Sequence, residues 1–173
     1  MPRDTSTDDI TKRLIERYVP IVSQVDGWGV LRDNSKAIYP QLGLPQPQEP
    51  FPAAYIYLAG QQHDWTQGQG IRRDIDTINI RIIGGPITPN YKFVPELKVY
   101  ELLTGVVNEL TYRPYLQDPD NNNEPFRYLD PNQHQTLGQI SRIGVFNYSD
   151  QGGYIGIEIP SIVALILKIG RVS

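Results

Sequence analysis

The side chains best suited to chemistry in this chain are two aspartates and a histidine, Asp74, Asp76 and His63. Carboxylate and imidazole groups bind divalent metals, so these three would suit a small metal-dependent hydrolase. The second histidine, His134, lies far along the chain, and neither HxxxH nor HExxH spacing occurs. No phosphate-binding glycine loop accompanies the two acids. We therefore interpret them as the solvated end of a strand that projects beyond the domain, and we expect no metal and no cofactor.

Other catalytic patterns are also missing from the sequence. Gly68-x-Gly70 lacks the third glycine and the strand-to-helix context of a nucleotide fingerprint. No Ser, His and acid grouping has a supporting motif. The absence of cysteine excludes disulfides, a thiolate zinc site and a cysteine nucleophile. The sequence predicts that the protein is not an enzyme.

The composition restricts the classes of partner. Nineteen acidic residues against sixteen basic ones give a net charge of −3. This charge opposes broad binding to nucleic-acid phosphates, so nucleic-acid binding is the weakest of the alternative functions. The longest apolar run, residues 162–167, falls short of the roughly 18 residues that a membrane span needs. Residues 1–9 are polar and resemble no signal peptide. We expect a soluble protein made in the cytoplasm, with no membrane partner.

A contact surface is the function that the remaining signals favour. Trp65 stands in the polar loop 61–71, close to Arg72 and Arg73, and aromatic and arginine side chains often anchor protein–protein contacts. An equally good interpretation folds Trp65 back over the domain's own core. The eleven tyrosines also suit half-buried or contact surface. The candidate partner-interface residues are His63, Trp65, Arg72, Arg73, Asp74, Asp76, Tyr115, Phe126 and Tyr128.

Two helices and several strands must position these residues. Apolar residues recur at helical spacing over residues 7–26, where Pro20 introduces a kink, and over residues 95–110, where Gly105 suggests close packing. Alternating β-branched residues predict strands, and Pro160 marks a bulge or break between the last two. The predicted strands are 53–60, 72–83 (antiparallel to the first and ended by Gly84-Gly85-Pro86), 138–148, 154–159 and 162–169.

Two segments fit neither class of element. Residues 39–52 contain five prolines and predict an extended strap that is neither helix nor interior strand, although an ordinary linker is the commoner meaning of such composition. Residues 114–137 are long and polar, and predict a protruding arm or flexible loop outside the core.

The expected fold is α+β in one domain covering residues 1–173. The order helix, strand, strand, helix, strand, strand favours an antiparallel sheet of about four strands with both helices on one face. The final strand is apolar on both faces, so either a central position in the sheet or a subunit contact must cover it.

The order of these helices and strands, together with their residue patterns, resembles that of the tail terminators of long-tailed bacteriophages, the gpU-like neck proteins. The resemblance covers most of the domain but includes no invariant motif. It rests on the N-terminal amphipathic helix, the strands AAYIYLAG and RRDIDTINIRIIGG, the helix 95–110 and the closing hairpin GYIGIEIPSIVALILKI. The strap and the arm depart from a minimal member.

The resemblance implies a structural virion protein at the neck of the particle, at the top of the tail. Such proteins form a hexameric ring that caps the tail tube, ends its polymerisation and meets the head-side connector. Genome DNA passes through the lumen without specific binding, and in a contractile tail the outer surface also meets the sheath. A connector or stopper at the head–tail joint is the alternative within the same class.

Overall fold

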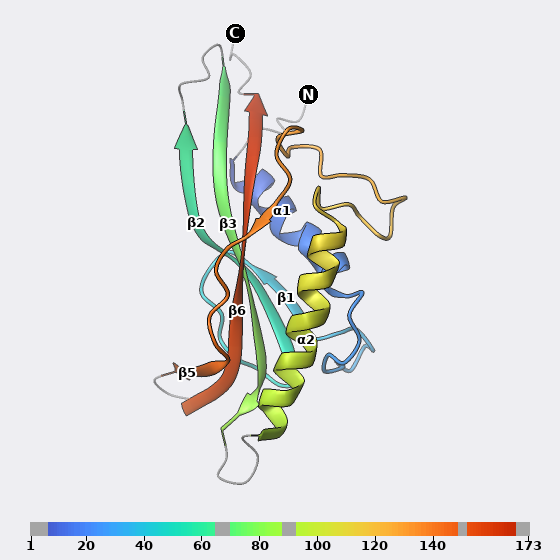
Figure 1. The fold of residues 1–173 in the computed structure, drawn as a ribbon, viewed down its shortest axis with the longest axis vertical. Helices are drawn as coiled ribbons and strands as arrows, with labels where there is room; N and C mark the ends of the chain where they lie inside the picture. Colours follow the sequence, from blue (N-terminus) through green and yellow to red (C-terminus); the bar gives the residue numbers. More distant parts are fainter. Residues whose placement is uncertain (1–6, 65–69, 88–92, 149–151, 169–173) are drawn as a thin grey trace.

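A computed structural model describes residues 7–64, 70–87, 93–148 and 152–168 of the chain. It confirms the α+β class, with two helices and a mixed sheet of six strands (Figure 1). The predicted sheet of about four antiparallel strands is therefore wrong in number and in order. The elements are α1 (Thr7–Val22), β1 (Ile38–Gln41), β2 (Ala53–Asp64), β3 (Ile71–Pro86), α2 (Phe93–Tyr112), β4 (Thr136–Leu137), β5 (Gly144–Tyr148) and β6 (Gly152–Lys168).

Three long strands form the centre of the sheet. Its order is β1-β2-β3-β6-β4, and β5 also pairs with β6. The antiparallel pairing of β2 with β3 confirms the prediction for these two segments. β1 pairs parallel to β2 and lies in the segment expected to be a strap. It is an edge strand, a position that tolerates Pro40.

The last strand is one continuous element rather than two. β6 runs for 17 residues straight through Pro160, so the predicted break there is wrong. Pro160 lies opposite Asn79 of β3, and its carbonyl accepts a hydrogen bond from Gly138 N on the other side. Because the N–H and C=O of one residue point the same way in a strand, the missing proline donor costs the β3 ladder nothing.

Both helices pack on the face of the sheet that carries Ile78, Ile80 and Ile82, and these residues join one core with the buried stripes of α1 and α2. α1 ends at Val22, four residues earlier than predicted, with Pro20 in its last turn. Gly105 is where α2 meets the chain beyond α1, since a Cβ there would lie 2.6 Å from Val25 Cγ1. The expected close packing at Gly105 is confirmed.

The predicted arm is anchored in the core, which corrects the expectation that residues 114–137 lie outside it. Leu116, Phe126 and Leu129 are buried. The segment also completes the edge of β6, where Asp130 N donates to the Ala164 carbonyl at 2.8 Å and Ile166 N donates to the Tyr128 carbonyl at 2.9 Å. Its tip, residues 120–125, is exposed throughout and lies in the loop that extends to the right of α1 in Figure 1, and residues 131–134 are exposed as well.

The final strand is covered by its central position. β6 lies between β3 on one side and β4, β5 and residues 128–130 on the other. Most of its apolar residues are buried within the chain, and Ile162 and Ile166 are half-buried. Among the helices of the described residues, none is long and apolar enough to cross a membrane.

Candidate functional site

Asp74 is the centre of a buried charge network between β2 and β3. Its carboxylate is fully buried, and Oδ1 lies 2.7 Å from His63 Nδ1. Arg72 Nη2 donates to Oδ2 at 2.9 Å, and Arg72 Nε lies 2.8 Å from Oδ1. The pairing register sets His63 opposite Asp74, and Arg72 lies on the same face two residues earlier. The interpretation of Asp74 as a solvated strand end is wrong, because flanking strands and the helix layer enclose this part of β3.

Asp76 is equally buried but poorly satisfied. Its side chain has no solvent exposure, and neither carboxylate oxygen accepts a well-aligned hydrogen bond in the described residues. The pKa of Asp76 is raised to about 6, chiefly by burial; the charge of Asp74 adds to the rise, while Gln61, His63 and Arg72 oppose it. The second half of the solvated-end interpretation is therefore wrong as well.

Asp76→Asn is expected to stabilise the protein above pH 6 and not at pH 4. Because the folded-state pKa is raised, the native protein holds this proton more tightly than the unfolded chain, so stability falls as pH rises from about 4 to about 6. A shift of about two pKa units corresponds to about 3 kcal/mol, so we expect a gain of about 1–3 kcal/mol at pH 8. Urea unfolding at both pH values measures it.

The control is Asp120→Asn, an exposed aspartate on the arm tip, which should change the unfolding free energy equally little at both pH values. An Asp76→Asn gain of the same size at pH 4 and pH 8 would contradict the assignment of the raised pKa to Asp76.

The described acids and histidines are not grouped in the way that a metal centre requires. Within residues 7–64, 70–87, 93–148 and 152–168, no group of three or more His, Asp or Glu side chains is placed to hold a metal ion. His134 lies apart from the network, with Nδ1 2.9 Å from the Gln135 carbonyl oxygen and its ring 6.3 Å from that of Tyr115. Asp74 instead has a cationic partner in Arg72, which takes the place that a metal ion would occupy.

The other candidate interface residues differ in exposure. Arg73 ties β3 to the arm, with Nη2 2.5 Å from Gln133 Oε1 and Nε 3.6 Å from Asp130 Oδ2. Trp65 lies outside the described residues. Arg72, Asp74, Asp76 and Phe126 are buried within the chain and offer little surface to a partner, whereas His63, Arg73, Tyr115 and Tyr128 retain some.

A second polar cluster lies on the opposite face of the sheet, and the sequence analysis missed it. Arg81 donates to Glu158 Oε1 at 2.8 Å and to the Tyr148 hydroxyl at 2.7 Å. Its guanidinium lies 4.3 Å from the centroid of the Phe146 ring. The Tyr57 hydroxyl also donates to Glu158, and burial raises the pKa of Tyr57. Four strands thus converge on one arginine, and this accounts structurally for part of the tyrosine excess.

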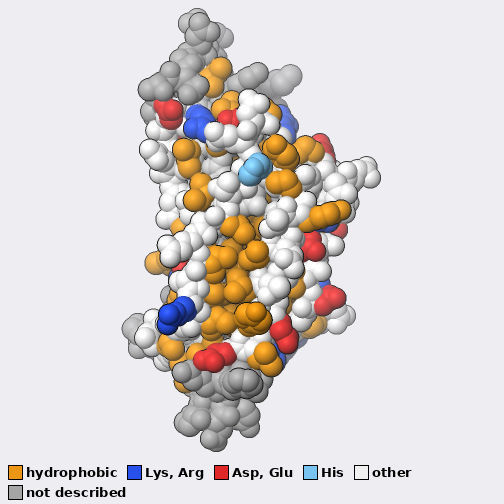
Figure 2. Space-filling view, viewed as in Figure 1, with side chains coloured by type: hydrophobic (Ala, Val, Ile, Leu, Met, Phe, Trp, Pro, Cys, Tyr) orange, Lys and Arg blue, Asp and Glu red, His pale blue; other side chains and the backbone are white. Residues whose placement is uncertain are grey.

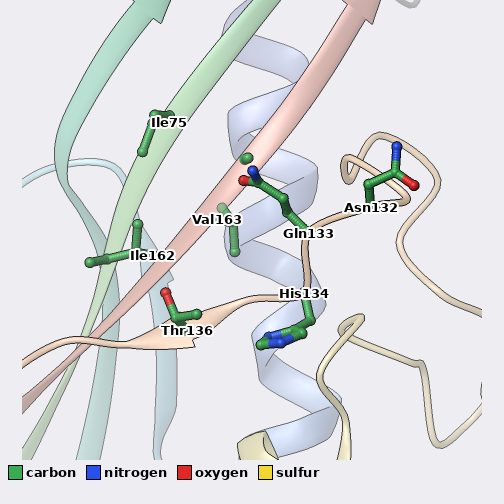
Figure 3. A pocket seen from close by; sticks show the side chains of 8 residues that line it. Ile75, Asn132, Gln133, His134, Thr136, Ile162 and Val163 are labelled. Atoms are coloured by element: carbon green, nitrogen blue, oxygen red, sulfur yellow. The ribbon is translucent and has the colours of Figure 1, made fainter.

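A shallow hollow of about 290 Å³ lies beside β6 on that face. Figure 3 shows Ile75 and Ile162 of the sheet on one side, and Asn132, His134 and Thr136 of the neighbouring segment on the other. The sheet side is apolar and the segment side polar. In the described part of the chain, no charged side chain lines this hollow.

Hydrophobic side chains gather on one face of the molecule (Figure 2). Figure 2 shows hydrophobic side chains gathered in a band across the middle of the viewed face, with acidic and basic groups scattered around it. The exposed large hydrophobic residues include Leu97 and Tyr100 on α2, and Leu42 and Leu44 after β1. On this face no continuous basic patch of the kind that tracks nucleic acid is visible.

Comparison with models of known protein families gives no match, and comparison with curated protein sequences gives no significant match.

Proposed function

We propose that this chain is a structural virion protein, a tail terminator that forms a hexameric ring on the tail tube, ends its polymerisation and joins the tail to the head-side connector. Its resemblance to gpU-like proteins motivates the proposal. The observation that carries it furthest is that the described residues leave exposed strand edges on both sides of the sheet, β1 and the outer end of β2 on one side and β5, which pairs with β6, on the other. A closed ring needs two different contact surfaces on each copy.

The proposed partners follow from this role. They are further copies of the chain, the tail tube protein, the connector protein and, in a contractile tail, the sheath. The exposed tip of the arm, residues 120–125, projects from the body and suits an outward contact (Figure 1). Genome DNA passes through the lumen, and a net charge of −3 is compatible with passage without specific binding. The protein would reside at the neck of the virion.

Two alternatives compete with this proposal. A connector or stopper at the head–tail joint would use the same exposed edges. A metal-dependent hydrolase would use His63, Asp74 and Asp76, but Asp74 already engages Arg72 and His63, and Asp76 is enclosed. The geometry therefore favours an assembly role over the hydrolase.

Loss of the gene from the virus that encodes this chain distinguishes these functions. A terminator is expected to leave headless tails longer than normal, because nothing ends tube growth, and expression of the chain in trans should restore the normal length. Electron microscopy of lysates measures both. Unattached tails of normal length would identify a connector or stopper instead. Normal virions, together with a purified chain whose hydrolytic activity is lost on chelation, would overturn the assembly role.

A further inference from the structure

Part of β2 has an open outer edge. β2 extends over Ala53–Asp64, but its outer neighbour β1 pairs only with residues 54–57. From Leu58 to Gln62, no strand of the described residues pairs with the outer side of β2, and Ala59–Gln62 are exposed. On the inner side, Gly60, Gln61 and Gln62 pair regularly with β3. We call residues 58–62 the open β2 edge.

The open β2 edge lacks most of the features that protect exposed strands. Proteins usually blunt such edges with lysine, proline, inward charges or a covering loop, because unpaired backbone groups recruit other strands. Residues 58–62 read Leu-Ala-Gly-Gln-Gln, with no charge and no proline. The bulge between Leu58 and Gly60 precedes the regular part of the edge. β1, by comparison, carries Pro40. The backbone at this edge is suited to accept a strand.

A second open edge lies at the other end of the sheet. The inner side of β5 pairs with β6 along its whole length, Gly144–Tyr148. Its outer side has no partner strand in the described part of the chain, and its sequence Gly-Val-Phe-Asn-Tyr is also uncharged. Val145 is 46% exposed and flanks Gly153 together with Ile87, which is 38% exposed. The β5 edge thus combines free backbone groups with an apolar patch.

The two edges have opposite strand senses within one sheet, because β2 is antiparallel to β3, β3 to β6, and β6 to β5. β6 bends at the end that pairs with β5, so β5 lies nearly across the long axis that the open β2 edge follows (Figure 1). An antiparallel pair between β5 of one copy and β2 of the next therefore requires the second copy to be rotated relative to the first. The paired surfaces differ, so the contact is head-to-tail and can close into a ring.

We infer that the open β2 edge of one copy binds the β5 edge of a second copy, which gives a sheet continuous across the subunit boundary. This deepens the proposed ring and rests on it. The open β2 edge lies beside residues 75–78 of β3, whereas β5 pairs with the end of β6 that lies beside residues 83–86. Successive copies are therefore offset along the paired strands as well as rotated relative to one another.

Disulfide trapping tests this contact directly, because the chain has no cysteine of its own. One copy carries Ala59→Cys or Gln62→Cys, the other carries Val145→Cys or Asn147→Cys, and the two are mixed under mild oxidation. We expect disulfide-linked dimers from at least one mixture. The decoy partner is Tyr112→Cys, a residue 77% exposed on α2, which should cross-link far less.

A charge test complements the trapping. Ala59→Lys with Gln62→Lys introduces the charges that protect natural edges and should raise the concentration needed for half-assembly by roughly tenfold or more. Thr104→Lys with Asn108→Lys on the exposed side of α2 is the matched control and should leave assembly unchanged. Mass measurement across a dilution series reads out both.

The outcomes separate this inference from the proposed ring. Rings that form normally in the edge-lysine variant, with no trapping above the decoy, would overturn the β2–β5 contact while leaving the ring intact. A wild-type chain that stays monomeric at every concentration would overturn both. Trapping in the mixtures together with loss of assembly in the edge-lysine variant alone would establish the contact.

Discussion

Asp74→Ala is expected to lower the free energy of unfolding by about 3–5 kcal/mol, the usual cost of removing one partner from a buried ion pair. The substitution removes the carboxylate that both Arg72 and His63 contact, in a place where Arg72 is only 7% exposed. Urea unfolding followed by circular dichroism at pH 7 measures the loss.

Two further variants make this result specific. Asp120→Ala removes an exposed aspartate and should change the unfolding free energy by less than about 0.5 kcal/mol. Replacing the pair together, Asp74→Leu with Arg72→Met, should recover much of the stability, because apolar side chains often substitute for a buried ion pair. A loss below about 1 kcal/mol for Asp74→Ala would show that the network is open to water, as the sequence alone suggested.

Phe126→Ala is expected to destabilise the protein by about 3–5 kcal/mol, the range for large-to-small changes of buried aromatic residues. Phe126 is 6% exposed and belongs to the main core, and the Arg17 guanidinium lies 5.4 Å from its ring centroid. Arg17 also donates to the carbonyls of Leu116 and Glu124, so this variant loosens the attachment of the arm to α1.

The matched control for Phe126 is Tyr112→Ala, which truncates an aromatic side chain that is 77% exposed and should cost less than about 1 kcal/mol. Limited proteolysis adds a local readout, since cleavage within residues 118–125 should accelerate in Phe126→Ala. If Phe126→Ala proved as mild as the control, residues 114–137 would be the loosely attached loop that their polar composition predicts.

Local periodicity predicted the elements that supply most of the core. The alternation of Ile78, Ile80 and Ile82 placed all three on the buried face of β3. In α2, the predicted stripe contains Val99 and Leu110, and both are buried. These predictions succeed because one face of a long element is enough to reveal its period.

The charge network was hidden from the sequence because burial there is a tertiary property. Asp74 and Asp76 look like a solvated strand end, yet they lie four and two residues before Ile78 and therefore on the same face of β3. Alternation alone would have placed them inside, and their charge argued against it. The prediction relied on the charge of these residues rather than on their place in the alternation. In the structure, Asp74 can be buried because Arg72 and His63 pair with its carboxylate.

The Tyr57–Arg81–Glu158 cluster could not be predicted from the sequence for a different reason. Its members lie on three strands, and only the pairing register, Tyr55 with Arg81 and Arg81 with Glu158, brings them together. Register across strands far apart in sequence is not encoded in any one of them. The short strands β1 and β4 were missed similarly, since four and two residues hold no measurable period.

The central claim, that the chain functions as a ring of identical subunits, is tested most directly by the mass of the purified full-length protein across a dilution series. The account predicts a species of six times the 19.6 kDa chain mass that persists on dilution, and that electron microscopy resolves as a six-fold ring with a central lumen. A particle of 19.6 kDa at every concentration, including the highest attainable, would contradict it.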